Sequence, residues 1–177
     1  MVSNALAASA VGHLAGLSAR DIKAGLEAFR PIPGRMNVLQ TTKGIHVVDD
    51  SYNANPGSME AALITLKVLR GKQRGFFVAG DMFELGAAAE FLHKKIGSKA
   101  AKSDIARLYV TGRHANALAS GAMEANMKSQ DIFIGTKEEI FMDLAERLQK
   151  GDWVLVKGSR AMGMEQIIRP LVAWADG

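Results

Sequence analysis

Short apolar segments alternate with amphipathic segments along most of this 177-residue chain, and that alternation restricts the fold more than any other feature. The apolar segments are 76–79, 108–110, 132–134 and 153–156, each of a length typical of one strand. Between them, apolar residues recur three and four positions apart, as they do on one face of a helix. Alternating strands and helices form a mostly parallel sheet with helices on both faces. We therefore predict an α/β fold.

The sequence also predicts what precedes this alternation. Two apolar segments, 38–40 and 45–48, flank Thr42-Lys43-Gly44, a pattern typical of a β-hairpin that opens the sheet. Residues 3–29 predict two helices, and Ser18 is a suitable N-cap for the second. The turn-prone sequence Pro31-Ile32-Pro33-Gly34 follows. We assign residues 1–30 to a helical remnant of a preceding domain and residues 31–177 to the main domain.

Two signals mark the later helices. Thr136 and Glu139 form a capping-box pattern ahead of Ile140, which predicts a helix start. Pro170 lies within the last apolar period, and we predict that it bends or ends that helix.

Composition excludes several functions. The net charge is +4, but the basic residues are spread along the chain, and the densest group is the pair Lys94-Lys95. Nucleic-acid-binding surfaces carry clustered basic residues, so we expect no nucleic-acid partner. The absence of cysteine excludes disulfides and thiolate catalysis, and the four histidines lack metal-ligand spacing. No apolar stretch approaches the ~18 residues that a membrane helix needs. We expect a cytoplasmic protein that contacts neither membrane nor nucleic acid and holds no metal in this chain.

Polar sequence follows four of the predicted strands, at residues 49–56, 80–86, 111–114 and 157–160. The carboxyl ends of parallel strands meet at one edge of a sheet, and ligands of open α/β sheets bind there. We therefore predict that these four loops form the ligand edge.

The first of these loops has the richest chemistry. Asn55 is a good N-cap and Pro56 a good first helical residue, so an anion could sit at that helix start. Plain turn chemistry explains Asn55 equally well, but not the preceding Asp49, Asp50 and Tyr52. Either aspartate is a reasonable partner for ribose hydroxyls. Neighbouring residues of a strand point to opposite faces, so we expect only one of the two aspartates to face the ligand.

The other loops allow two interpretations each. Asp81 and Glu84 could hold a substrate ammonium group or belong to a solvated loop. Residues 157–160, Lys-Gly-Ser-Arg, could bind a carboxylate or phosphate or form a basic surface turn.

His114 is the one histidine that we place at this edge. The chain has no G-x-x-x-x-G-K-[ST] phosphate loop, so a complete ATP site is not expected from these residues alone.

Four motifs in order resemble the third domain of the Mur ligases, specifically the member that adds D-alanyl-D-alanine. They are Pro-Gly-Arg-Met at 33–36, Val-Asp-Asp-Ser-Tyr-Asn-Ala-Asn-Pro-Gly-Ser-Met at 48–59, Gly-Asp-Met-Phe-Glu-Leu-Gly at 80–86 and Val-Lys-Gly-Ser-Arg at 156–160. The resemblance extends to residues 1–30, which are similar to the end of that family's central ATP-binding domain. It implies a Rossmann-like fold for residues 31–177.

The resemblance also implies an activity. In this family ATP phosphorylates the carboxylate of UDP-N-acetylmuramoyl-tripeptide, and the amine of D-alanyl-D-alanine attacks the acyl phosphate. The central domain supplies the phosphate loop, the Mg²⁺ ligands and the catalytic lysine. The implied nucleotide-binding residues here are Arg35, Asp50, Tyr52, Asn53 and Asn55. Asp50 would face the nucleotide and Asp49 the opposite side, so we expect Asp50→Ala to weaken ATP binding without unfolding the domain. The implied substrate-binding residues are Asp81, Met82, Glu84, Lys157, Ser159 and Arg160.

Two departures from the family pattern limit these expectations. The phosphate loop and most of the central domain are missing, so we expect this fragment to be inactive, to contain no catalytic residue and to bind no cofactor firmly. Residues 161–164 lack an additional basic residue common in the family, which leaves Arg160 as the charge of that turn. The alternatives are a stand-alone nucleotide-binding module and a related amide ligase such as a folylpolyglutamate synthase; the asparagine-rich loop argues against the latter.

Overall fold

The computed structural model of the chain describes residues 2–30 and 32–177. Its helices are α1 (Val2–Leu14), α2 (Ala19–Ala28), α3 (Pro56–Arg70), α4 (Ala89–Lys102), α5 (Ala115–Glu124), α6 (Lys137–Arg147) and α7 (Glu165–Asp176). Its strands are β1 (Asn37–Gln40), β2 (His46–Asp50), β3 (Gly75–Ala79), β4 (Arg107–Val110), β5 (Ile132–Ile134) and β6 (Trp153–Lys157). Short 3-10 turns are η1 (Gly86–Ala88), η2 (Ser129–Asp131) and η3 (Arg160–Met162).

The chain divides into two compact units, residues 1–31 and residues 32–177. The first contains α1 and α2, the two helices predicted from the sequence. Ser18 is the N-cap of α2 and accepts a hydrogen bond from the backbone N–H of Asp21, as predicted. Large apolar side chains of this unit, including Leu6 and Leu14, are exposed. Its assignment to a preceding domain remains a prediction.

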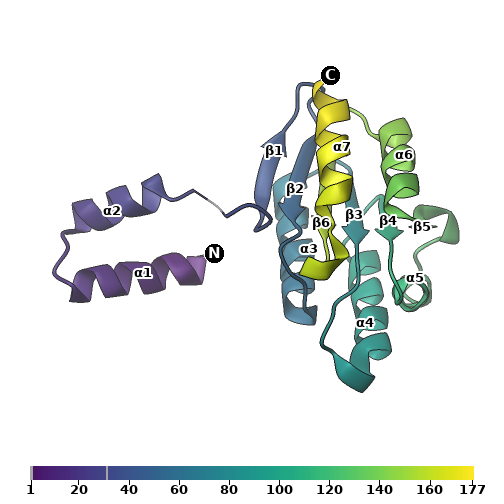
Figure 1. Cartoon of the computed structure of the whole chain (residues 1–177), viewed down its shortest axis with the longest axis horizontal. Coiled ribbons are helices and arrows are strands. Elements are labelled where there is room, and N and C mark those ends of the chain that lie inside the picture. Colours follow the sequence, from purple (N-terminus) through teal and green to yellow (C-terminus); the bar gives the residue numbers. More distant parts are fainter. Residues whose placement is uncertain (1, 31) are drawn as a thin grey trace. The chain divides into compact units, whose positions relative to one another are not determined.

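The second unit is built on one six-stranded sheet with the order β1-β2-β6-β3-β4-β5. The strands β1 and β2 form the predicted antiparallel hairpin, and all other neighbouring strands are parallel. Helices α6 and α7 cover one face, and α3, α4 and α5 cover the other (Figure 1). The predicted α/β fold with a mostly parallel sheet is therefore confirmed.

Alternating side chains of the strands fill two hydrophobic cores. Val48 and Phe77 belong to the core beneath α3, α4 and α5. Their neighbours Val47 and Phe76 belong to the core beneath α6 and α7. The central strands β3 and β6 are covered on both faces, and nearly all of their side chains are apolar, as expected for a buried parallel sheet.

Of the two effects predicted for Pro170, bending or ending the last helix, the second is wrong. Pro170 lies inside α7, which continues to Asp176. A proline here removes one backbone hydrogen bond. On both sides of it, however, Ile167 and Leu171 are fully buried in the core beneath the helix. Tertiary packing therefore outweighs the local cost of the proline.

Candidate functional site

The four predicted loops all follow the carboxyl ends of parallel strands and meet at one edge of the sheet (Figure 1). Hydrogen bonds connect them directly. The backbone N–H of Gly80 donates to the carbonyl of Lys157, and that of Thr111 donates to the carbonyl of Ala79. The N–H of Ser159 donates to the carbonyl of Asp81. The loops therefore form one connected surface at the predicted ligand edge.

Lys157 connects the first loop to the end of β6. Strand register places Lys157 between Asp50 on β2 and Ala79 on β3. Its Nζ lies 2.6 Å from Oδ2 of Asp50 and donates a 2.8 Å hydrogen bond to the carbonyl of Asn53. Lys157 is only 2% exposed, so the structure contradicts its interpretation as part of a basic surface turn. Its charge is engaged in holding the loop of residues 49–55.

The segment before β1 packs on the same loop. Gly34 accepts a hydrogen bond from the backbone N–H of Tyr52, and the Met36 N–H donates to Oδ1 of Asp50. The guanidinium of Arg35 lies 4.1 Å from the centre of the Tyr52 ring, a cation–π contact. Arg35, Asp50 and Tyr52, three of the predicted nucleotide-binding residues, are thus brought together.

Asn55 is the N-cap of α3. Its side chain accepts a hydrogen bond from the backbone N–H of Ser58, and the Ser58 hydroxyl accepts one from the Asn55 N–H. Pro56 is the first helical residue, as predicted. The Asn53 side chain bonds to the N–H of Ala54, so it too shapes the loop locally. Both asparagines have structural partners in addition to any ligand.

Asp81 and Glu84 do not form the predicted carboxylate pair. Asp81 is buried, and its oxygens accept hydrogen bonds from the backbone N–H groups of Arg113 (2.7 Å) and His114 (3.0 Å). The solvated-loop interpretation is therefore wrong for Asp81, which joins the loops after β3 and β4. Glu84 is exposed and has a left-handed backbone with a φ of 63°, which is uncommon for a non-glycine residue.

Ser159 links the first loop to the second. It is buried, its Oγ accepts a 2.8 Å hydrogen bond from the backbone N–H of Phe83, and it contacts the carbonyl of Ala54 at 3.4 Å. Gly158 permits this arrangement, because a Cβ there would lie 3.2 Å from Cα of Gly80. Arg160 is exposed and contacts Glu165 at 3.4 Å. Arg160 is therefore the accessible cation of the 157–160 loop.

Sequence analysis missed the role of His93. The ring is fully buried, accepts a hydrogen bond from the Met82 N–H and stacks on His114 with centroids 4.5 Å apart. Burial lowers the pKa of His93, and the nearby His114 reinforces that shift. A histidine eleven residues after Met82 gives no local signal of such a contact.

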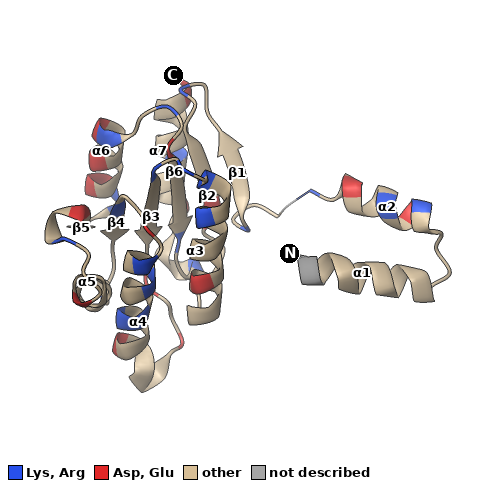
Figure 2. Ribbon diagram, turned by 180° about the vertical axis from the view of Figure 1, so that it is seen from behind, with Lys and Arg blue, Asp and Glu red and all other residues tan. Residues whose placement is uncertain are grey.

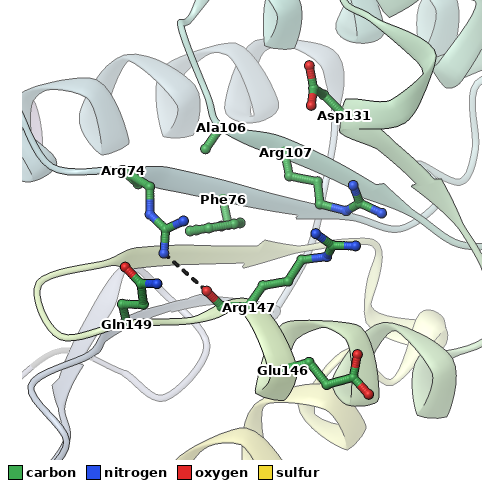
Figure 3. Close-up of a pocket in the computed structure, with 8 residues that line it drawn as sticks. All are labelled: Arg74, Phe76, Ala106, Arg107, Asp131, Glu146, Arg147 and Gln149. Carbon is green, nitrogen blue, oxygen red and sulfur yellow. Dashed lines mark hydrogen bonds between the residues drawn. The ribbon is translucent and has the colours of Figure 1, made fainter.

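Sequence analysis also missed a cavity of about 370 Å³ at the amino ends of the strands, opposite the predicted ligand edge. Arg74, Arg107 and Arg147 line it, and Arg74 donates to the carbonyl of Arg147 (Figure 3). Each guanidinium already has an acidic partner, Asp152 for Arg74 and Asp143 for the other two. The cavity is thus bordered by ion pairs.

Metal-binding groups and membrane-spanning helices can be assessed for the residues that the structure describes. They contain no group of three or more histidine, aspartate or glutamate residues arranged to hold a metal ion. Among the same residues, no helix combines the length and the apolar character needed to cross a membrane. Figure 2 shows Lys and Arg residues, in blue, spaced along α4.

Comparison with known proteins identifies the family. The model of the family described as Mur ligase, glutamate ligase domain, matches residues 34–160. The chain belongs to the Mur ligase family. This match includes the strands and loops of the ligand edge, from Gly34 to Arg160, so the family assignment applies to the site as well as to the fold.

Individual relatives within the Mur ligase family are more specific. The chain is 33% identical over 171 residues to the UDP-N-acetylmuramoyl-tripeptide–D-alanyl-D-alanine ligase of Bacillus subtilis, covering 97% of this chain and 37% of that protein. It superposes on MurF from Acinetobacter baumannii with a TM-score of 0.84, at 32% identity, over 96% of this chain and 37% of that one.

A second solved structure was determined with a nucleotide. The MurF ligase of Thermotoga maritima in complex with ADP superposes with a TM-score of 0.78 at 30% identity, over 94% of this chain and 36% of that chain. The chain thus spans little more than a third of the length of these relatives.

Proposed function

We propose that this chain is the C-terminal part of an ATP-dependent ligase that joins D-alanyl-D-alanine to UDP-N-acetylmuramoyl-tripeptide. The observation that supports this most strongly is similarity to a ligase of that name over 97% of the chain, with the motifs of that ligase gathered at one sheet edge. The chemistry forms one amide bond: ATP phosphorylates the tripeptide carboxylate, and the dipeptide amine displaces phosphate from the acyl phosphate.

In this proposal Arg35, Asp50 and Tyr52 form the nucleotide side of the edge. Arg35 has an exposed position above the Tyr52 ring, and its guanidinium can contact ATP phosphates. Tyr52 is 43% exposed and offers a ring for the adenine. Asp50 is fixed by Lys157, so its carboxylate needs no reorganisation to accept a ribose hydroxyl. Asn53 and Asn55 shape the loop that presents these groups.

The dipeptide side comprises the 80–86 loop and the 157–160 loop. Ser159 fixes the distance between them through Phe83, which leaves the exposed Glu84 and Arg160 to meet the charged ends of a dipeptide. Glu84 would hold an ammonium group and Arg160 a carboxylate. Asp81 and Met82 are assigned here to shaping this pocket, because both are buried.

The remaining parts of the reaction belong to the domains that precede this region in the relatives. They include the phosphate loop, the catalytic lysine and the Mg²⁺ ligands, and residues 1–30 are proposed as the end of the central domain. ATP and the UDP-linked precursor are cytoplasmic metabolites, so we propose that location. Closure of this domain over the central one would bring the two reacting groups together and exclude water.

The proposal is tested by phosphate release from the complete enzyme. We expect turnover of ~1 s⁻¹ or more only when ATP, UDP-N-acetylmuramoyl-tripeptide and D-alanyl-D-alanine are all present. Replacing the dipeptide by D-glutamate or diaminopimelate serves as the matched control and should abolish turnover. The 177-residue chain alone should stay at background. Equal turnover with another amino substrate would refute the substrate assignment.

A further inference from the structure

We infer that the neutral imidazole of His93 positions the proposed dipeptide-binding loop, residues 80–86, by accepting a hydrogen bond from the backbone N–H of Met82. His93 would be a positioning residue, since the loop lies between it and any substrate. The inference deepens the proposed function and rests on it for the identity of the ligand. The loop contact itself is independent of that identity.

The two ring nitrogens of His93 define one tautomer. Nδ1 lies 2.7 Å from the carbonyl oxygen of Ala89, which can only accept, so Nδ1 bears the proton. Nε2 lies 2.9 Å from the backbone nitrogen of Met82, which can only donate, so Nε2 must be unprotonated. Only the neutral ring satisfies both contacts. The side chain is fully buried, so water cannot replace a lost partner.

His93 holds one side of the loop and Ser159 holds the other. Met82 donates to His93 on α4, and the next residue, Phe83, donates to Ser159 beyond β6. The following residue, Glu84, has the uncommon left-handed backbone and is exposed at the tip. Two consecutive backbone anchors therefore fix the direction in which Glu84 leaves the sheet edge. Loss of either anchor would release that residue.

Two titratable groups on neighbouring elements face the ring. The Asp81 carboxylate, after β3, has Oδ1 3.7 Å from Nε2, and the His114 ring, at the start of α5, stacks on it. Protonation would make Nε2 a donor that opposes the Met82 N–H and is attracted to Asp81. Asp81 also holds the backbone of Arg113 and His114. A charged His93 would thus exchange one loop anchor for a contact that competes with another.

Burial lowers the pKa of His93, so the ring is neutral at neutral pH. The unfolded chain takes up this proton near pH 6.5, before the folded one does. The stability that depends on neutral His93 is therefore complete above about pH 6.5 and declines as the pH falls toward the folded value. Loop order in the folded protein is lost only as the pH falls through that folded value.

Two variants distinguish the effect of losing the hydrogen bond from the effect of changing the side-chain volume. His93→Leu removes the acceptor and keeps an apolar side chain, whereas His93→Gln keeps an acceptor near the position of Nε2 that does not titrate. His13→Leu, at an exposed histidine of α1, is the control for loss of a histidine elsewhere. Thermal unfolding of each variant shows whether the domain remains folded.

In the complete enzyme, we expect His93→Leu to raise KM for D-alanyl-D-alanine about tenfold, with KM for ATP unchanged, because one hydrogen bond to the loop is lost. His93→Gln should restore a KM near that of the unmodified enzyme. KM of the unmodified enzyme should rise as the pH falls through the folded pKa of His93, which lies below its ordinary value, and that of His93→Gln should not. Equal KM values for the dipeptide in all three proteins would overturn the inference.

A second measurement does not depend on enzyme activity. In the 177-residue chain, the backbone amide resonance of Met82 should shift with the same midpoint as the His93 ring, and this shift should vanish in His93→Gln. If the complete enzyme fails to use D-alanyl-D-alanine while Met82 still follows His93, the proposed function is wrong and the loop contact stands. If Met82 does not follow His93, the inference is wrong whatever the activity.

Discussion

The ammonium group of Lys157 and the carboxylate of Asp50 lie 2.6 Å apart across neighbouring parallel strands, and both side chains are largely buried. This ion pair changes the interpretation of the roles of both residues. Asp50 had been expected to lie in a solvent-facing loop and to be dispensable for folding, but it is the last residue of β2 and only 14% of its side chain is exposed. Lys157 balances Asp50 and is not a free phosphate ligand.

Removing Asp50 should therefore destabilise the domain. Asp50→Ala leaves the ammonium of Lys157 buried without its counter-charge, and we expect the free energy of unfolding to fall by about 3 kcal/mol. The double variant Asp50→Ala/Lys157→Met removes the uncompensated charge and should recover most of that loss. Urea unfolding of the three proteins measures both effects. A single variant as stable as the original would show that the pair contributes little.

Nucleotide affinity is tested with a milder change. Asp50→Asn keeps a side-chain oxygen for the Met36 N–H but also removes the counter-charge of Lys157, so urea unfolding must first show that the variant is folded. In the folded variant we expect KM for ATP to rise about tenfold in the complete enzyme, because the ribose contact is weakened. Asp49→Asn is the control, because Asp49 bonds to its neighbour Ser51 and strand alternation directs it to the opposite face. If Asp49→Asn instead raises KM, the ribose contact belongs to Asp49.

The contact between α4 and α5 depends on two glycines. A Cβ at Gly97 would lie 1.8 Å from the carbonyl oxygen of Leu118, and a Cβ at Gly121 would lie 1.8 Å from that of Lys94. Gly97→Ala should therefore lower the free energy of unfolding by about 2–3 kcal/mol, since backbone must move. Gly25→Ala, in α2 with open space around it, should instead favour its helix by about 0.5–1 kcal/mol. Equal effects at Gly97 and Gly25 would contradict this packing.

Acid sensitivity should arise in part from Asp143. Burial alone would raise its pKa, but hydrogen bonds from Tyr109 and Arg147 and the charge of Arg107 hold the pKa below its ordinary value. Burial raises the pKa of Tyr109, so its hydroxyl remains a donor. The stabilisation is present above about pH 4 and is lost as the pH falls through the lower folded value.

Asp143→Asn should therefore flatten the dependence of unfolding free energy on pH between about pH 5 and pH 2. Tyr109→Phe should cost about 2 kcal/mol at neutral pH, because one hydrogen bond to a charged group is lost. Urea unfolding at several pH values tests both. If the unfolding free energy of Asp143→Asn falls with decreasing pH as steeply as that of the original chain, the acid sensitivity arises from other carboxylates.

Local sequence was sufficient to predict the helices and strands and the sheet edge at which the polar loops meet. The N-caps at Ser18, Asn55 and Thr136 were predictable because a cap depends on residues three positions apart. The loops after β2, β3, β4 and β6 were predictable as neighbours because parallel strands share an edge whatever their order.

The partners of the polar residues were not predictable, because they depend on strand order and register. Lys157 meets Asp50 only because β6 lies beside β2, and nothing near either residue indicates that pairing. The same holds for Asp81, whose partners lie more than thirty residues later in the chain. Exposure was therefore overestimated for Asp50, Asp81 and Lys157.

We propose that substrates of the complete ligase meet this domain at the carboxyl edge of the sheet. Amide hydrogen exchange, with and without ATP analogue and D-alanyl-D-alanine, tests it most directly. We expect slower exchange in the loops 49–55, 80–86, 111–114 and 157–160, and unchanged exchange around Arg74, Arg107 and Arg147. Protection confined to those arginines, with the four loops unaffected, would place the ligand in the opposite cavity and contradict the account.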